Sequence, residues 1–184
     1  SKNRNRSNRF IVCQINMRRV IDLAFAILSS IGLLPIFFVV AILAKLQSPG
    51  PILYRAKRVG KHGTIFEMYK FRTMVANDDS FGQQLTAYHD PRITAIGSFL
   101  RHWKLDEIPQ FINIIKGEMS LIGPRPESPN YVQHYTRDQR QILQVRPGIM
   151  GPSQFANRNE GEKLKNQSNP EQFYINILMQ EKLQ

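Results

Sequence analysis

The chain has little cysteine and little negative charge. Its 184 residues contain one cysteine, Cys13, so an intrachain disulfide framework and a cysteine zinc cluster are both excluded. Its histidines do not have the spacing of metal ligands; they are His62, His89, His102 and His134. Only 14 Asp and Glu stand against 25 Lys and Arg, which gives a net charge of +11. We therefore expect anionic partners: nucleic acid, phosphorylated metabolites or acidic lipid head groups.

Charged side chains are absent from the whole of Leu23–Ala44. As a straight helix this run would measure about 33 Å, close to the thickness of the hydrocarbon core of a bilayer. It is too long for a signal peptide, and no A-x-A-like cleavage site follows it. We therefore predict a membrane segment. At its start, we expect Asp22 to cap the helix or to pair with Arg18 or Arg19.

Two features predict that this segment leaves the membrane by the face it entered. Pro35 lies near its middle and removes one backbone hydrogen bond, which allows a bend. Basic residues flank both ends, and the positive-inside rule draws both ends to the cytoplasm. These residues are Arg4, Arg6, Arg9, Arg18 and Arg19 before the segment and Lys45, Arg55, Lys57, Arg58 and Lys61 after it. The alternative is a single-pass anchor that tolerates its proline.

The rest of the chain shows short alternating elements. Ile52–Ala56 and Thr64–Phe71 are rich in β-branched and aromatic residues, and the glycines of residues 60–63 lie between them, so we predict an antiparallel hairpin. Ile93–Arg101 and Leu105–Ile115 carry apolar residues at helical spacing. They predict amphipathic helices that lie either in the membrane interface or against a core. The polar composition of residues 75–89 predicts a loop or a loosely held helix over the surface.

These patterns predict an α+β fold with three segments along the chain. We expect a mostly helical monotopic membrane domain with a proline-kinked re-entrant helix, interfacial amphipathic helices and a short β-hairpin. Residues 1–19 would form a basic N-terminal segment, residues 20–47 the re-entrant helix, and residues 48–184 a cytoplasmic domain on the membrane surface.

Two adjacent carboxylates, Asp106 and Glu107, stand out in so basic a chain. Neighbouring anions repel each other, so such a pair persists where a cation or bound substrate compensates it, and Mg²⁺ with an anionic phosphate would do so. The alternative is a solvated helix start, where the helix dipole favours acidic residues.

Two turns combine an arginine with proline and glycine. In the first, Pro124 and Pro126 stiffen the chain on both sides of Arg125, which can then present its guanidinium to a phosphate at low entropic cost. The second contains Arg146 and Gly148 around a proline. Each turn alone reads equally well as an ordinary loop with a solvated arginine. Together, downstream of an acidic pair, they indicate a site for a doubly phosphorylated substrate.

Four segments then carry a specific resemblance. They are Tyr69–Met74 (YKFRTM), Leu105–Gln110 (LDEIPQ), Gly117–Pro126 (GEMSLIGPRP) and Val145–Ile149 (VRPGI). In this order, and after a proline-broken apolar segment, they resemble the bacterial sugar transferase family, in its small form the monotopic phosphoglycosyl transferases. The resemblance covers about Met17 to Asn159. Family members often have serine before the membrane proline, where this chain has Leu34.

The resemblance implies an activity. It implies transfer of a sugar 1-phosphate from a UDP-sugar to polyprenyl (undecaprenyl) phosphate, with release of UMP, which begins glycan assembly on a lipid. Asp106 would be the nucleophile and form a covalent aspartyl-phosphosugar, and Mg²⁺ held by Asp106 and Glu107 would neutralise the diphosphate. Glu107 would hold the metal or assist proton movement. The residues implied to bind phosphates or the nucleotide are Lys70, Arg72, Arg101, Pro124, Arg125, Pro126, Arg146 and Gly148.

The resemblance also implies a place in the cell: the inner membrane of a bacterium, with the catalytic domain on the cytoplasmic face and membrane lipids as partners. The rival interpretation is a basic, membrane-tethered binding protein without chemistry. The sequence has no nucleic-acid-binding signature, so we expect no nucleic acid partner. Two questions stay open: whether the chain forms a homo-oligomer, and whether the donor is a plain hexose or an N-acetylated amino sugar.

Overall fold

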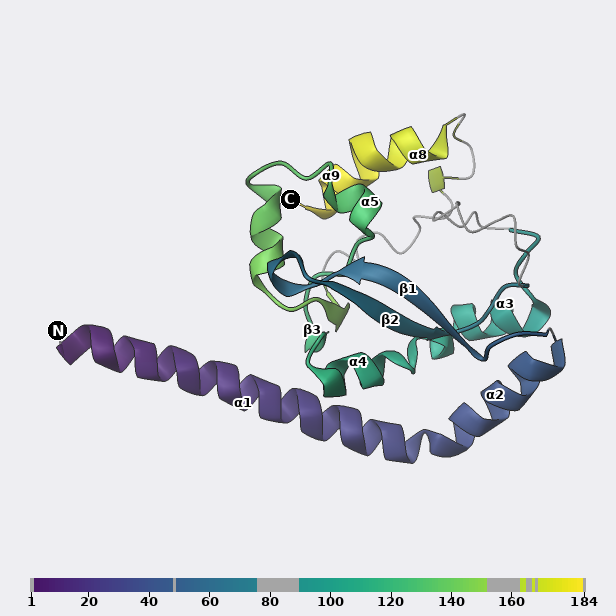
Figure 1. Cartoon of the computed structure of the whole chain (residues 1–184), viewed down its shortest axis with the longest axis horizontal. Helices are drawn as coiled ribbons and strands as arrows, with labels where there is room; N and C mark the ends of the chain where they lie inside the picture. Colours follow the sequence, from purple (N-terminus) through teal and green to yellow (C-terminus); the bar gives the residue numbers. More distant parts are fainter. Residues whose placement is uncertain are drawn as a thin grey trace.

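A long N-terminal helix and a shorter one bent away from it lie along one side of the molecule (Figure 1). The computed structural model describes residues 2–47, 49–75, 90–151, 163–164, 167 and 169–183, with side chains from Met17 onward. Helix α1 spans Lys2–Gly32 without a break at residue 19, and α2 spans Leu34–Gln47. The fold is α+β, as predicted, with two small two-stranded sheets.

The bend between α1 and α2 follows from local chemistry at Pro35. Proline has no N–H, so the carbonyl of Ile31 cannot receive the hydrogen bond that a continuous helix would give it. The helical bonds continue on both sides, since the Leu33 N–H donates to Ser29 over 2.9 Å and the Phe37 N–H to Leu33 over 2.9 Å. The Ser30 hydroxyl donates to the Ala26 carbonyl (2.6 Å), a bond that also favours bending. The two helices meet at 61°.

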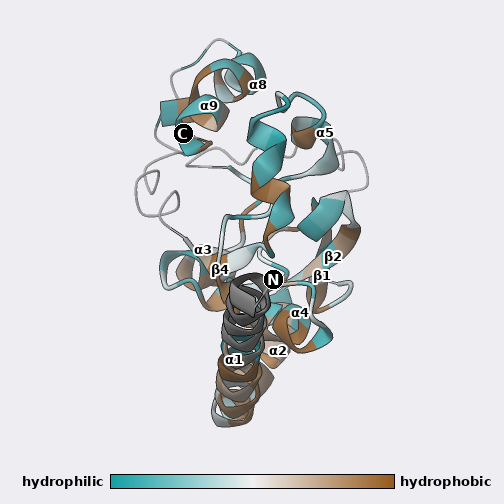
Figure 2. Ribbon diagram, turned by 90° about the vertical axis from the view of Figure 1, so that its left-hand side faces the viewer, coloured by the Kyte–Doolittle hydropathy of each residue, from teal (hydrophilic) through white to brown (hydrophobic). Residues whose placement is uncertain are grey.

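Apolar side chains of both helices remain exposed. Figure 2 shows the hydrophobic colouring of the lower part of α1. Among the described helices, none by itself is long and apolar enough to cross a membrane. The stretch Met17–Gly32 and helix α2 meet that requirement only as a pair across the bend. Exposed large apolar residues here include Leu28, Ile31, Phe38, Ile42 and Leu46.

A β-hairpin crosses the middle of the molecule. Strand β1 (Leu53–Val59) pairs antiparallel with β2 (Ile65–Phe71), from Leu53 opposite Phe71 to Val59 opposite Ile65, through the short turn η1 (Lys61–Gly63). The predicted hairpin is therefore present, with a first strand that begins one residue later and ends three residues later than expected. Its buried side chains contribute to all three hydrophobic clusters formed by the described residues, so the hairpin fixes the elements around it.

The acidic pair lies between two helices. Helix α3 (Ala95–His102) begins at Thr94, whose hydroxyl accepts from the Gly97 N–H (2.9 Å) as an N-cap. A 3₁₀ turn, η3 (Leu105–Glu107), follows, and then helix α4 (Gln110–Lys116). The sequence predicted one helix over Leu105–Ile115, which was wrong. Pro109 lacks an N–H and cannot continue the helical hydrogen bonds, so the chain makes a turn first and begins a new helix after it, although Ile108 keeps helical dihedral angles.

The two arginine-containing turns come together through a second sheet. Strand β3 (Ser120–Ile122) pairs in parallel with β4 (Gly148–Met150), with Ser120 opposite Gly148. Between these strands lie α5 (Pro129–Val132) and the 3₁₀ helix η4 (Gln139–Gln144). The chain continues with α8 (Pro170–Phe173), the π-helical turn η5 (Tyr174–Leu178) and α9 (Met179–Lys182). Of the segment predicted to form a polar loop or loosely held helix, residues 76–89 lie outside the described residues.

Three hydrophobic clusters hold these elements together. One joins the end of β1 to α5 and the C-terminal helices, a second joins α1, the hairpin and α4, and a third joins α2, β2 and α3. Ala26 of α1 and Val40 of α2 belong to the second and third clusters. The apolar helices are therefore packed directly on the elements that carry the acidic pair.

Candidate active site

Asp106 and Glu107 lie in the turn η3, where Lys104 takes the left-handed backbone conformation (φ 59°) just before them. Their residues are only 7% and 9% exposed. A solvated helix start is therefore wrong as an interpretation of this pair. Two buried adjacent carboxylates need compensating charges, and the neighbouring elements supply them.

Glu107 is held between two cations. Its Oε1 accepts from Lys70 Nζ at 3.0 Å and from an Arg125 guanidinium nitrogen at 3.0 Å. Burial alone would raise the pKa of this carboxyl, but the charges and hydrogen bonds of Lys70 and Arg125 outweigh it and lower the pKa to about 2. Glu107 is therefore an anion at any physiological pH, and it fixes the positions of both cations.

Asp106 has a different environment. Its Oδ1 is buried and has no hydrogen-bond partner. Burial raises the pKa of this carboxyl, and the charge of Glu107 raises it further, while Lys70 and Arg101 act in the opposite direction. Arg101 is itself oriented by a hydrogen bond from its Nε to the Thr73 hydroxyl (2.8 Å). An unpartnered carboxylate oxygen in a basic site is free to bind a metal or to attack an electrophile.

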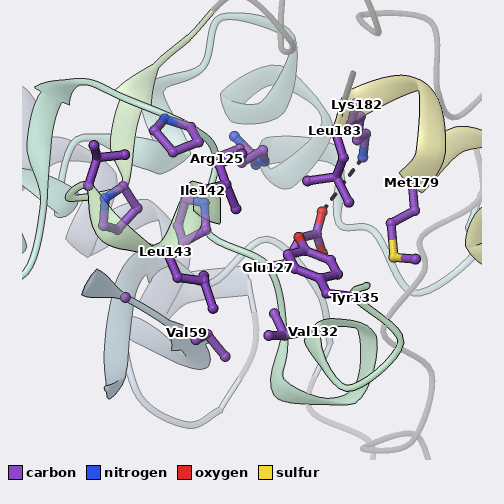
Figure 3. A pocket seen from close by; sticks show the side chains of 15 residues that line it. Val59, Arg125, Glu127, Val132, Tyr135, Ile142, Leu143, Met179, Lys182 and Leu183 are labelled. Carbon is purple, nitrogen blue, oxygen red and sulfur yellow. Dashed lines mark ion pairs between the residues drawn. The ribbon is translucent and has the colours of Figure 1, made fainter. Parts of the chain in front are cut away.

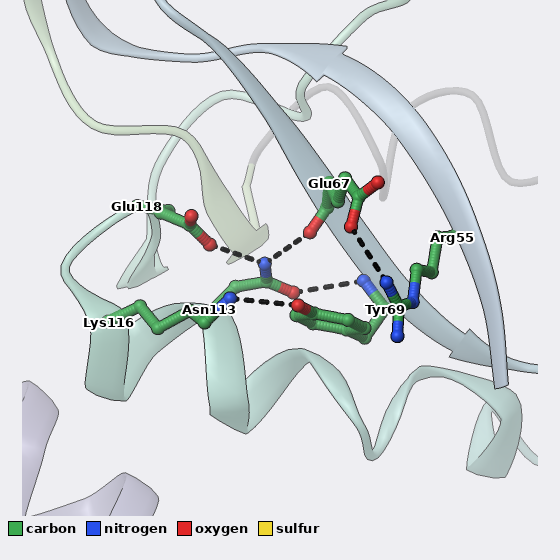
Figure 4. A network of polar contacts seen from close by, with 6 residues as sticks. All are labelled: Arg55, Glu67, Tyr69, Asn113, Lys116 and Glu118. Carbon is green, nitrogen blue, oxygen red and sulfur yellow. Dashed lines mark hydrogen bonds and ion pairs between the residues drawn. The ribbon is translucent and has the colours of Figure 1, made fainter.

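Lys70 is placed by the strand β2, and β2 is held against α4 by a buried amide (Figure 4). The Asn113 side chain, 0% exposed, accepts from the Tyr69 N–H (3.0 Å) and donates to the Glu67 carbonyl (2.6 Å). It also donates to the Glu118 carboxylate (2.7 Å). Tyr69 directly precedes Lys70, so the hydrogen bonds of this amide to the backbone of β2 fix the position of Lys70.

The ring of Tyr69 adds to the same network on the surface. Lys116 Nζ donates to the Tyr69 hydroxyl (2.8 Å) and lies over its ring, and the guanidinium of Arg55 lies 5.8 Å from the ring centroid. These contacts join the two strands of the hairpin, at the paired residues Arg55 and Tyr69, to the last turn of α4. The network therefore couples the helix after the acidic pair to the strand that supplies Lys70.

Arg125 is placed by the pairing of β3 with β4. The Gly148 N–H donates to the Pro124 carbonyl (2.9 Å) and the Gly123 N–H to the Met150 carbonyl (2.9 Å). A Cβ on Gly148 would lie 2.1 Å from the Gly123 nitrogen, so this position requires glycine. The role of Gly148 in the described structure is close packing of the two turns, and its N–H is already donated within the protein.

Helix α1 contacts strand β3, which precedes Arg125, and helix α4, which follows the acidic pair. The Asp22 carboxylate, 5% exposed, accepts from the Ser120 hydroxyl (2.6 Å) and from the Leu121 N–H (3.1 Å) of β3. Arg19 donates to the carbonyls of Ile114 (2.7 Å) and Ile115 at the end of α4. We expected Asp22 to cap its own helix or pair with Arg18 or Arg19, and this was wrong. The partner lies 98 residues away, where a buried hydroxyl and a free strand N–H need an acceptor.

Two other predicted binding residues donate to backbone carbonyls at helix ends. Arg72 donates to Ala44 (3.3 Å) and Pro49 (3.0 Å) after α2, and Arg146 Nε donates to Gly117 (3.1 Å) after α4. Such contacts stabilise the negative ends of helix dipoles. The structure thus brings Lys70, Arg101 and Arg125 around the carboxylates, whereas Arg72 and Arg146 hold neighbouring elements. Pro35 lies at the bend of the apolar helices, as described above.

The carboxylate oxygens of this site suit a metal ion that is also coordinated by substrate phosphates. In the described part of the chain, no three His, Cys, Asp or Glu side chains converge as a metal site. Mg²⁺ commonly takes one or two carboxylates and completes its shell with water and substrate phosphates. The unpartnered Oδ1 of Asp106 suits that role. Glu107 suits it less, since Lys70 and Arg125 already occupy its Oε1.

Three residues at or around the site, Asn113, Thr73 and Gln110, had no role assigned from the sequence, and a fourth, Asp22, was expected to have another partner. Asn113 and Asp22 act as braces, and Thr73 orients Arg101. The amide nitrogen of Gln110 is buried without a partner, four residues after Asp106. Gln110 and Thr73 each had a signal, since they belong to the segments Leu105–Gln110 and Tyr69–Met74. Asn113 and Asp22 are ordinary polar residues whose partners are distant in the sequence.

Comparison with known proteins agrees with this geometry. The family described as "Bacterial sugar transferase" matches residues 13–180. A UDP-N-acetylgalactosamine-undecaprenyl-phosphate N-acetylgalactosaminephosphotransferase of Aeromonas hydrophila is 41% identical over 143 residues, 75% of this chain and 33% of that protein. The exopolysaccharide production protein ExoY of Sinorhizobium fredii (strain NBRC 101917 / NGR234) is 39% identical over 158 residues, 78% of this chain and 70% of that protein.

A third relative is named for a different sugar. The UDP-glucose:undecaprenyl-phosphate glucose-1-phosphate transferase of Escherichia coli (strain K12) is 38% identical over 147 residues, 76% of this chain and 31% of that protein. The chain thus spans about a third of the length of the Aeromonas and Escherichia relatives. The names of the Aeromonas and Escherichia relatives share undecaprenyl phosphate and differ in the sugar.

Proposed function

The chain belongs to the bacterial sugar transferase family, a family of enzymes, and from this premise we propose that it transfers a sugar 1-phosphate from a UDP-sugar to undecaprenyl phosphate. The product would be a lipid-linked sugar diphosphate, the first intermediate of a polysaccharide or other glycoconjugate. The observation that carries the proposal is the buried carboxylate of Asp106 with an unpartnered oxygen, beside a Glu107 that holds two cations.

In the first step, a carboxylate oxygen of Asp106 attacks the phosphorus that carries the sugar. A new bond forms between that oxygen and the phosphorus, the bond from this phosphorus to the bridging oxygen breaks, and UMP leaves with the electron pair. Lys70 and Arg125, fixed by Glu107, neutralise charge on the phosphates as it shifts toward the leaving group. Arg101 adds a further positive charge near Asp106.

In the second step, a phosphate oxygen of undecaprenyl phosphate attacks the same phosphorus. The bond from phosphorus to the Asp106 oxygen breaks, the carboxylate is regenerated, and the lipid-linked sugar diphosphate leaves. The protein contributes one nucleophile, Asp106, and the same set of cations serves both in-line displacements at this phosphorus. Glu107, with a pKa of about 2, holds no proton at neutral pH, so its role is to position Lys70 and Arg125.

Mg²⁺ is the cofactor we propose for this site. Asp106 would hold it together with the donor's phosphates, and the ion would supply charge neutralisation of the diphosphate. Oδ1 of Asp106 has no hydrogen bond to give up for that role.

We further propose that α1 and α2 form a re-entrant membrane segment, with the catalytic domain on the cytoplasmic face of a bacterial inner membrane. The 61° bend and the exposed apolar side chains support it, as does basic charge on both flanks. Cysteines placed near Asn5 and near Lys61 should then label from the same side of sealed vesicles. Labelling from opposite faces would mean a single-pass anchor instead.

The activity is tested by UMP release from purified protein in detergent with UDP-sugar, Mg²⁺ and undecaprenyl phosphate. We expect stoichiometric UMP and lipid-linked sugar, and little sustained UMP release when the lipid is omitted. A basic membrane-tethered binding protein would release no UMP under any of these conditions. That result, with a panel of UDP-sugars, would refute the proposed function.

A further inference from the structure

Lys104 has a backbone conformation that its residue type disfavours. It takes the left-handed region, at φ 59° and ψ 17°, immediately before the turn that contains Asp106 and Glu107. Among the described residues, only His62 shares a positive φ without being glycine, and histidine is one of the types enriched there. Glycine or asparagine would adopt this conformation more easily than lysine. A disfavoured conformation beside reacting groups points to a use for the side chain.

The fold itself does not use the Lys104 side chain. The residue is exposed, and within the described part of the chain its ammonium group has no hydrogen bond or ion pair. Its N–H donates to the Arg101 carbonyl (3.3 Å) and its carbonyl accepts from the Glu107 N–H (3.2 Å), bonds that most residue types could make. Burial raises the pKa of Asp106, and the charge of Lys104 is among those that act in the opposite direction. Lys104 is therefore a solvent-facing cation within electrostatic range of the proposed nucleophile.

Two exposed aromatic side chains lie beside this cation. Phe99 is 58% exposed and Trp103 is 62% exposed. They are one helical turn apart at the end of α3, since the Trp103 N–H donates to the Phe99 carbonyl (3.2 Å). Another face of α3 is buried against α2, where Leu100 and Val40 belong to one cluster, and Figure 1 shows the two helices side by side. The aromatic pair thus lies next to the proposed membrane segment, and tryptophan favours the head-group level of a bilayer.

The small cavity lined by Arg125 does not offer another place for a lipid phosphate (Figure 3). Its volume is about 30 Å³, and since one water molecule needs about 10–15 Å³, it accommodates about two waters. Carboxylates also balance its two basic residues: Arg125 donates to Glu107 (3.0 Å), and Lys182 Nζ lies 3.8 Å from the Glu127 carboxylate. A phosphate that carries a prenyl chain is therefore bound outside this cavity.

We propose that Lys104, Phe99 and Trp103 bind the acceptor lipid. The ammonium group binds the phosphate of undecaprenyl phosphate, and the two aromatic side chains pack on the first isoprene units of its chain. The inference rests on the proposed function and names the acceptor site. A phosphate monoester carries up to two negative charges, which an exposed ammonium group complements. Because Lys104 is two residues before Asp106, it holds this phosphate on the approach to the phosphorus that is attacked in the second step.

Separate kinetics of the two substrates test this site. In a double displacement, kcat/KM for each substrate reports its own step. Lys104→Asn removes the charge and suits the left-handed backbone, and UMP release is measured in a non-ionic detergent without phospholipid. We expect kcat/KM for undecaprenyl phosphate to fall about tenfold and kcat/KM for the UDP-sugar to change less than about twofold. Lys104→Arg keeps the charge and should stay within about threefold of the native value for the lipid.

His62→Asn is the matched control. His62 is exposed, has φ 58°, and lies in the hairpin turn at the end of β2 away from Lys70. Both asparagine variants relieve the same backbone conformation, so both should unfold at a slightly higher denaturant concentration than the native protein. Only Lys104→Asn should lower kcat/KM for the lipid, which separates loss of the cation from a change in the fold.

A second variant tests the aromatic contacts independently. Trp103→Ser removes an exposed ring at little risk to the core, and it should lower kcat/KM for undecaprenyl phosphate about fivefold while the value for the UDP-sugar stays unchanged. An unchanged value for the lipid contradicts the aromatic contacts.

Three results overturn the binding of the phosphate by Lys104. They are an unchanged kcat/KM for the lipid in Lys104→Asn, an equal loss for the UDP-sugar, and a loss in Lys104→Arg as large as in Lys104→Asn. Failure of the proposed function is a different result, since the native protein would then release no UMP with any UDP-sugar.

Discussion

The surroundings of Asp106 and of Glu107 differ sharply, although the two residues are neighbours in one 3₁₀ turn. Glu107 accepts from Lys70 and Arg125, and its pKa falls to about 2. Asp106 has a buried oxygen without a partner, and burial raises its pKa. Similar carboxylates thus receive opposite environments from the elements packed on each side of the turn.

This difference teaches how an acidic pair can divide two tasks. A carboxylate that is fully hydrogen-bonded to cations is a poor nucleophile but a good anchor, since it keeps those cations in place without substrate. A carboxylate with an unpartnered oxygen is ready to bind and react, at a cost in folding stability. We therefore assign reaction to Asp106 and positioning to Glu107, and the predictions below test that division.

Asp106→Asn should have the largest effect. An amide is a poor nucleophile, so turnover should fall by about 10³-fold or more. Because the pKa of Asp106 is raised in the folded protein, its ionised form at neutral pH opposes folding, and Asn should increase the free energy of unfolding by about 0.5–2 kcal/mol. UMP release and denaturant unfolding measure both effects. A variant that loses activity together with stability would contradict the assignment.

Glu107→Gln should have the next largest effect, through Lys70 and Arg125. Without the anion these two cations repel each other, so we expect turnover to fall about 10–100-fold and stability to fall by about 2–3 kcal/mol, less than for a fully buried pair. Arg125, 37% exposed, is partly screened by water. Glu67→Gln is the control, because its pair with Arg55 is exposed on both sides and should contribute at most about 0.5 kcal/mol.

Asn113→Ala should have a smaller effect on turnover, because Asn113 acts by fixing the position of Lys70. Three hydrogen bonds of a buried amide are lost, so stability should fall by about 2–3 kcal/mol and turnover by about tenfold as β2 shifts. In a double-mutant cycle with Lys70→Met, the loss of turnover caused by Asn113→Ala should largely disappear. An equal loss in both backgrounds would mean that Asn113 supports the fold and has no role in placing Lys70.

The pH dependence of the first step should show the smallest effect. Asp106 must be ionised to attack, and its pKa is raised, so the rate of UMP release without lipid should fall on acidification at a higher pH than for an ordinary aspartate. Glu107, with a pKa of about 2, stays ionised throughout. Glu107→Gln removes a neighbouring anion, and the acid limb should therefore move to lower pH. An unchanged limb would show that Glu107 does not act on Asp106.

Much of the local structure could be predicted from the sequence, because it depends on short-range chemistry. The bend at Pro35 follows from a missing N–H, and the hairpin follows from two β-rich runs around a glycine turn. The acidic pair and Arg125 were found from motifs that contain unusual combinations of charge and proline.

The long-range contacts could not be predicted in the same way. Asp22 pairs with Ser120 across 98 residues, and nothing in either neighbourhood marks the other as its partner. Strands β3 and β4 have three residues each, too short for any periodic signal, and they pair only because glycines allow close approach. Asn113 reads as one polar residue on an amphipathic helix, and only the packing of β2 against α4 makes it a buried brace.

The most direct test of the division between the two carboxylates is to trap the first step. Protein incubated with a UDP-sugar and Mg²⁺, without lipid, is examined by intact-protein mass spectrometry and peptide mapping. We expect one sugar phosphate on Asp106 in the native protein, the same adduct formed more slowly in Glu107→Gln, and none in Asp106→Asn. An adduct mapped to Glu107, or full turnover by Asp106→Asn, would contradict this division.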